Sequence, residues 1–142
     1  MERIDLNTAK KAMEQGEEKA KSIGVPMVIT IVNDEANFIA SHRMDGALLA
    51  SVDISQNKAW TSAALKMSTS QLSENSKNNG ELFGINSTNN GKVVIFGGGI
   101  PLYVNNNLVG AVGVSGGSVN EDIEVAQAVE DFINKLDIES FV

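Results

Sequence analysis

Apolar residues recur in the first part of the chain with a helical and then a strand-like spacing. After Asp5, which suits a helix N-cap, apolar side chains return every three or four residues as far as Ile23. This spacing predicts a helix over about residues 5 to 23. Val25 to Val32 is almost continuously apolar and rich in β-branched residues, which is typical of a strand buried on both faces.

A second strand and a long helix are predicted next. Phe38 to Met44 follows a run of turn-forming residues, so it is expected to form a hairpin with the first strand. Beyond Asp45 and Gly46 a helical pattern extends to about Met67. This helix is apolar on two sides, which indicates that the sheet covers one side and a second element or subunit the other. Ser68 begins a capping-box pattern that predicts a short helix.

The remaining pattern predicts a polar loop, three strands and a last helix. Residues 75–91 are rich in Asn and Gly and are expected to line a site, contact a partner or be mobile. The three strands are predicted at Val93–Phe96, Ile100–Val104 and Leu108–Ser115. Ser118 starts a second capping box before an amphipathic helix. The predicted fold class is α+β, with a five-stranded antiparallel sheet flanked by helices.

Composition limits the classes of function that fit this chain. Its 142 residues fit one domain, and it contains no cysteine, which excludes disulfides, thiolate metal sites and cysteine nucleophiles. A net charge of −7 argues against nucleic-acid binding, which needs clustered Lys and Arg. No apolar run approaches the roughly 18 residues that cross a bilayer, and no signal peptide is recognisable. We therefore expect a cytoplasmic protein without membrane or nucleic-acid partners.

The most varied chemistry lies at the corner between the second strand and the long helix, at His42, Arg43, Met44 and Asp45. His42 is the only histidine and can bind heme iron or another metal, or it can be a structural residue. Met44 can be a second soft ligand or a core residue. Arg43 and Asp45 can clamp a carboxylate ligand or form a salt bridge, and Asp45 also suits the N-cap of the helix.

Other residues also have both a binding and a structural interpretation. Gly97, Gly98 and Gly99 can bring backbone amides close to an anion, or they can form a turn without a ligand. The acids at 121, 122 and 124 can ligate a hard cation, although a helix macrodipole also favours acids in its first turn. The glycines at 110, 113 and 116 do not form a dinucleotide fingerprint. No catalytic triad, paired-carboxylate spacing or P-loop is recognisable.

Four segments carry a resemblance to a known family. They are Arg43-Met44-Asp45-Gly46-Ala47, Ser51 to Lys58, Gly98-Gly99-Ile100-Pro101, and Val109 to Gly116. In order and spacing the chain resembles the GlcG/HbpS-like family, also called the heme-degrading domain family DUF336. The resemblance implies a profilin-like layer architecture and a homo-oligomer. It also implies an association with heme or corrinoid biology.

These observations lead to one functional hypothesis with two alternatives. We expect an accessory protein that binds a small ligand, with heme as the first candidate. Arg43 would pair with a propionate, His42 or Met44 would approach the iron, and Gly97 to Gly99 would form a rim. One alternative is an oligomeric interaction module without a cofactor. The other is an enzyme acting on a small hydroxy acid held by Arg43.

Overall fold

An antiparallel sheet forms the centre of the molecule, and its strands lie in the order β2-β1-β4-β3. The computed structural model describes residues 2–139. Within that range the four strands are β1 (Val28–Asn33), β2 (Phe38–Arg43), β3 (Gly99–Val104) and β4 (Asn107–Ser115). The hairpins β1-β2 and β3-β4 meet through the antiparallel pairing of β1 with β4. The strands β2 and β3 are therefore the two opposite edges of the sheet.

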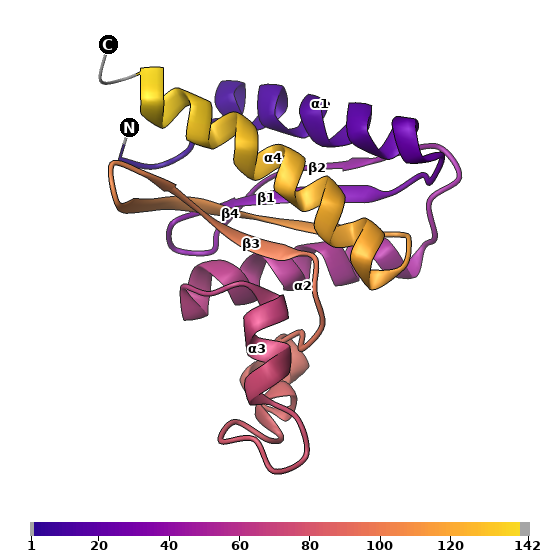
Figure 1. Ribbon diagram of the computed structural model, residues 1–142, viewed down its shortest axis with the longest axis vertical. Coiled ribbons are helices and arrows are strands. Elements are labelled where there is room, and N and C mark those ends of the chain that lie inside the picture. The colour runs from indigo at the N-terminus through magenta and orange to yellow at the C-terminus, as the bar shows by residue number, and fades with distance from the viewer. Residues whose placement is uncertain (1, 140–142) are drawn as a thin grey trace.

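Helices cover both faces of the sheet (Figure 1). The helices α1 (Leu6–Ile23) and α4 (Val119–Glu139) lie side by side on one face, with α1 over β1 and β2 and α4 over β3 and β4. The helix α2 (Ala50–Leu65) lies on the other face. The α+β class and the flanking helices are thus confirmed.

A structured arm extends away from the body of the molecule (Figure 1). It contains α3 (Thr69–Asn75) and the two short 3₁₀ turns η1 (Ile85–Ser87) and η2 (Asn89–Gly91). Backbone hydrogen bonds within the arm link Leu82 N to Asn75 O and Ile85 N to Leu82 O. The segment predicted as a loop is therefore held by local turns, because Asn and Gly supply the positive φ values that these turns need.

The starts of α1 and α4 follow the predicted capping chemistry. The Asp5 carboxylate accepts a hydrogen bond from Thr8 N, and Gly24 ends α1 with a φ of 74°. Ser118 and Glu121 form a complete capping box, since each side chain accepts a hydrogen bond from the other residue's backbone N–H. Local sequence therefore determines where α1 and α4 begin.

The prediction of a fifth strand at Val93–Phe96 is wrong. Residues 93–96 have no strand pairing, and the backbone there is bound by a side chain of α2 instead. Thr61 Oγ1 accepts a hydrogen bond from Val94 N at 3.1 Å and donates one to Lys92 O at 3.2 Å. The segment is therefore held to α2 by Thr61 and does not join the sheet.

The buried face of α2 is composed of small and polar residues. Leu48 lies before the helix and is 64% exposed, so it does not join the helix face that packs on the sheet. Ser51, Ser55 and Ser62 are buried instead. The cause is Gly113 of β4, where a Cβ would overlap Ser55 O. The helix backbone therefore approaches the strand closely, and larger side chains on that helix face would not fit.

Candidate functional site

An open depression of about 600 Å³ lies beside the corner where β2 ends. Its lining residues come from α1, β2 and the turn after β2: Glu17, Lys21, Ser41, His42, Arg43, Met44 and Asp45. Four of the seven predicted site residues, His42 to Asp45, are therefore brought together. The volume falls within the range of roughly 300–1,000 Å³ that is common for small-molecule sites.

His42 faces the α1 side of the sheet and contacts a carboxylate there. It pairs with Ile29 of β1 in the strand register, so both side chains point toward α1. Its Nδ1 lies 2.5 Å from Oε1 of Glu17. The His42 side chain is 40% exposed and the Glu17 side chain 23% exposed. The hydrogen bond at Nδ1 thus fixes the imidazole ring, and the ring is still accessible to a ligand in the depression.

The other three corner residues have distinct surroundings. Arg43 is exposed and donates from Nη2 to Ala47 O at 3.1 Å, which fixes the turn between β2 and α2. Met44 packs against the core, and its Sδ accepts a weak hydrogen bond from Met27 N at 3.5 Å. Asp45 is exposed. It is not the N-cap of α2, because that position is Leu49, which makes no side-chain capping bond.

The glycines predicted as a rim lie elsewhere in the fold. Gly97, Gly98 and Gly99 lead into β3, the edge of the sheet opposite to β2. A Cβ on Gly98 would lie 2.6 Å from Lys58 Nζ, and a Cβ on Gly99 would lie 2.6 Å from Lys58 O. Gly98 and Gly99 therefore allow close packing against α2, whereas a Cβ on Gly97 would meet Ile123 of α4 and Ser70 of α3. None of the three glycines lines the depression.

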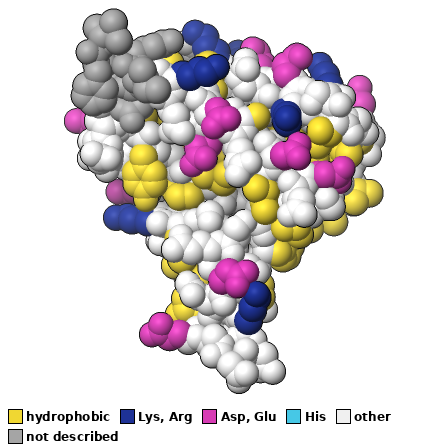
Figure 2. Space-filling view, viewed as in Figure 1, with side chains coloured by type: hydrophobic (Ala, Val, Ile, Leu, Met, Phe, Trp, Pro, Cys, Tyr) yellow, Lys and Arg dark blue, Asp and Glu magenta, His cyan; other side chains and the backbone are white. Residues whose placement is uncertain are grey.

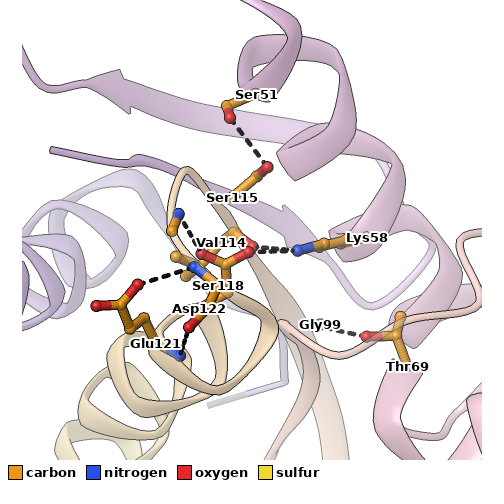
Figure 3. Close-up of polar contacts among 10 residues, drawn as sticks. Ser51, Lys58, Thr69, Gly99, Val114, Ser115, Ser118, Glu121 and Asp122 are labelled. Atoms are coloured by element: carbon orange, nitrogen blue, oxygen red, sulfur yellow. Dashed lines mark hydrogen bonds and ion pairs between the residues drawn. The ribbon is translucent and has the colours of Figure 1, made fainter. Parts of the chain in front are cut away.

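Sequence reasoning missed the pairing of Lys58 with Asp122. Lys58 is completely buried, and its Nζ donates to Asp122 Oδ2 at 3.0 Å and to Val114 O at 2.7 Å. The ammonium also lies 5.0 Å from the centroid of the Phe96 ring. Figure 3 shows the two charged side chains pointing toward one another from α2 and α4. The sequence held one signal of this burial: Lys58 lies between serines of a helix that packs on a glycine-containing strand.

Burial dominates the electrostatics of this pair. Loss of hydration lowers the pKa of Lys58, and the attraction of Asp122 opposes that change. Loss of hydration also raises the pKa of Asp122, and the Lys58 ammonium and the hydrogen bond from Gly117 N oppose it. Each charge is therefore tolerated in the interior chiefly because the other one is present.

The alternative of a hard-cation site at the start of α4 is not supported within residues 2–136. Asp122 is bound to Lys58, Glu121 takes part in the capping box, and Glu124 lies 3.8 Å from Lys19. No group of three or more His, Asp or Glu side chains suited to a metal ion occurs among the described residues. In the same part of the chain, no helix is both long and apolar enough to cross a membrane.

Comparison with known proteins identifies the family of the chain. The model of the family described as haem-degrading protein HbpS-like matches residues 4–130. The chain belongs to the HbpS-like family. Over 133 residues this HbpS-like chain is 40% identical to an uncharacterized 15.0 kDa protein of the dhaT-dhaS intergenic region of Citrobacter freundii, with 94% of each chain covered.

A second relative is much longer than the HbpS-like chain. The corrinoid adenosyltransferase PduO of Salmonella typhimurium is 40% identical over 117 residues. The match covers 82% of this chain and 35% of PduO. The similarity therefore concerns about a third of the PduO sequence, and the activity of the whole enzyme is a separate question.

Two solved structures are similar to this HbpS-like chain over nearly their full length. Klebsiella pneumoniae ORFY superimposes with a TM-score of 0.91 at 37% identity, covering 94% of this chain and 92% of ORFY. The protein of a PduOC–heme complex superimposes with a TM-score of 0.89 at 36% identity, covering 93% and 96%. HbpS of Streptomyces reticuli, with a TM-score of 0.83 at 24% identity, shares the fold.

Proposed function

We propose that this chain is an accessory protein that binds a heme-like tetrapyrrole in the depression beside His42. The observation that carries the proposal is the position of the only histidine, half-exposed in a depression of about 600 Å³ and held there by Glu17. The support from relatives is the heme complex of PduOC, a protein 36% identical to this chain.

The side chains around the depression fit the chemical groups of heme. An imidazole nitrogen is a common axial ligand of heme iron, and His42 offers one here. Lys21 of α1 and Arg43 of β2 provide two cations in the lining of the depression, and they can pair with the carboxylates of two propionates. When bound, heme would supply an iron centre, while the chain supplies an imidazole, two cations and the surface that orients the ring.

Corrinoids are the second candidate ligand, because PduO is a corrinoid adenosyltransferase and the chain is 40% identical to part of it. A corrinoid carries amide side chains where heme carries propionates. The two cations at Lys21 and Arg43 therefore favour heme. Competition between hemin and hydroxocobalamin separates the two ligands.

Titration with hemin, followed by visible absorption, tests the proposal. We expect a shifted Soret band that saturates near one hemin per chain, and a weakened or altered band in His42→Ala. Hydroxocobalamin at the same concentrations should not displace hemin. Absence of a saturable shift at micromolar hemin would reject heme binding. An unchanged band in His42→Ala would reject the site.

Self-association and a cytoplasmic location stay predictions. The exposed side chains of Leu48 and Leu49, at 64% and 74%, support self-association because an interface would remove them from water. Sedimentation of the wild type and of a Leu48→Ser/Leu49→Ser variant tests this part. A single slow species for both proteins would contradict it.

A further inference from the structure

We propose that Glu17 is a positioning residue that holds the proton of His42 on Nδ1, so that Nε2 is the nitrogen offered to the depression. The two atoms in question, Glu17 Oε1 and His42 Nδ1, are 2.5 Å apart. An ionised carboxylate can only accept hydrogen bonds, so the imidazole nitrogen that faces it carries the hydrogen. The lone pair of the neutral ring is then on Nε2.

The close approach of α1 to the sheet makes this contact possible. Gly16 precedes Glu17, and a Cβ on Gly16 would lie 2.8 Å from Ile29 Cδ1 and 2.9 Å from Val129 Cγ2. Ile29 is the cross-strand partner of His42. The absence of a side chain at position 16 therefore lets α1 lie close to the strand pair that carries His42, and Glu17 reaches the ring. Glycine inside a helix costs about 1 kcal/mol relative to alanine, which argues for a packing reason at this position.

The same contact has a chemical consequence for a metal-binding ligand. Histidines that bind metals usually donate their other ring N–H to a carboxylate or carbonyl group. That hydrogen bond fixes the ring orientation and makes the metal-binding nitrogen more basic. At this site Glu17 would fix the ring of His42 and make its Nε2 more basic. A more basic nitrogen ligand stabilises oxidised iron relative to reduced iron. This last step rests on the proposed heme binding, whereas the assignment of the tautomer does not.

Nitrogen NMR of the ligand-free protein tests the tautomer directly. Because His42 is the only histidine, protein labelled with ¹⁵N-histidine gives signals from one ring. We expect the neutral ring to show the Nδ1–H tautomer in the wild type. We expect a shift toward the Nε2–H tautomer in Glu17→Ala, because free imidazole side chains prefer that form. Glu17→Gln keeps an acceptor oxygen and should keep most of the Nδ1–H form.

Glu14→Ala is the matched control, because Glu14 is exposed on the same helix and does not line the depression. It should leave the ring signals unchanged. An Nε2–H tautomer in the wild type, or the same spectrum in Glu17→Ala, would overturn the inference. Circular dichroism identifies a variant that has lost the fold, and the tautomer of the wild type then decides the inference by itself.

The midpoint potential of the hemin complex gives the second measurement. We expect a more positive potential in Glu17→Ala than in the wild type, an intermediate value in Glu17→Gln, and no change in Glu14→Ala. Unchanged potentials in both Glu17 variants would overturn the electronic part of the inference. Failure of the wild type to bind hemin would reject the proposed function alone, since the NMR result on the ligand-free protein still decides the role of Glu17.

Discussion

The Lys58 ammonium lies 3.0 Å from the Asp122 carboxylate, and the two side chains join helices that cover opposite faces of the sheet. The pair is 0% and 5% exposed. It also includes Val114 O at the end of β4 and Gly117 N in the turn that follows. One buried ion pair thus links α2, β4 and α4, at a place distinct from the depression beside His42.

Removal of one partner of this pair should strongly destabilise the fold. Lys58→Met keeps the shape of the side chain but leaves the Asp122 carboxylate buried without its ammonium. We expect a loss of about 3–5 kcal/mol in the free energy of unfolding, measured with urea. The double variant Lys58→Met/Asp122→Asn removes both charges and should recover much of that loss. Equal instability of the single and double variants would contradict a dominant role for the unpaired charge.

The destabilisation of the single variants should depend on pH in opposite directions. Without Lys58, burial raises the pKa of Asp122 further above its unfolded value, so the folded state gains stability as it takes up a proton in acid. The deficit of Lys58→Met relative to the wild type should therefore shrink as pH falls from 7 toward 5. In Asp122→Asn the pKa of Lys58 is lowered further, so that deficit should shrink as pH rises. Urea titrations at several pH values measure the deficits of both variants. Parallel pH profiles of the variants and the wild type would exclude a change in the pKa values of Asp122 and Lys58 as the cause.

Gly98 should be sensitive to any side chain because the ammonium lies against it. Its φ is 125°, and a Cβ would lie 2.6 Å from both Lys58 Nζ and Val114 O. We expect Gly98→Ala to lower the free energy of unfolding by more than about 2 kcal/mol. Gly84→Ala is the control, since Gly84 has a φ of 86° but no atom within 4 Å of a Cβ there. That change should cost about 1–2 kcal/mol from backbone strain alone. Similar losses for the two variants would show that crowding at Lys58 is unimportant.

The cations beside the depression should contribute to hemin affinity through charge. Lys21→Ala and Arg43→Ala are each expected to weaken hemin binding by about 2–5-fold, the range of an exposed ion pair. The loss should diminish at high salt, because salt screens exposed charges. Lys10→Ala, on an exposed part of α1 away from the depression, should have no effect. Absorption titrations at two ionic strengths measure these changes, and salt-independent losses would point to packing instead of charge.

Most of the fold was predictable because its elements have strong local signals. The N-cap at Asp5, the left-handed Gly24 and the capping box at Ser118 each act through neighbouring residues. The error at Val93–Phe96 arose because its partner, Thr61, lies far away in the sequence. On α2, periodicity placed Ala59 and Ala63 correctly on the buried side, but it did not predict the buried serines. Small side chains are needed there because Gly113 lets the helix backbone approach the strand.

The candidate site was predictable only where its residues are neighbours in the sequence. His42 to Asp45 form one continuous run, and they do line one depression. Glu17 and Lys21 were missed because α1 contributes them from a distant part of the chain. Gly97 to Gly99 had the composition of an anion-binding turn, but Gly98 and Gly99 lie against Lys58, and Gly97 lies against Ile123 and Ser70. On the face shown in Figure 2, acidic and basic side chains are interspersed.

Pulsed electron paramagnetic resonance of the ferric hemin complex would test the central claim most directly. Because His42 is the only histidine, ¹⁵N-histidine labelling places the isotope in one imidazole ring. We predict a ¹⁵N hyperfine coupling between that ring and the iron, and its disappearance in His42→Ala. A stoichiometric hemin complex of the wild type without any ¹⁵N coupling would contradict iron binding by His42.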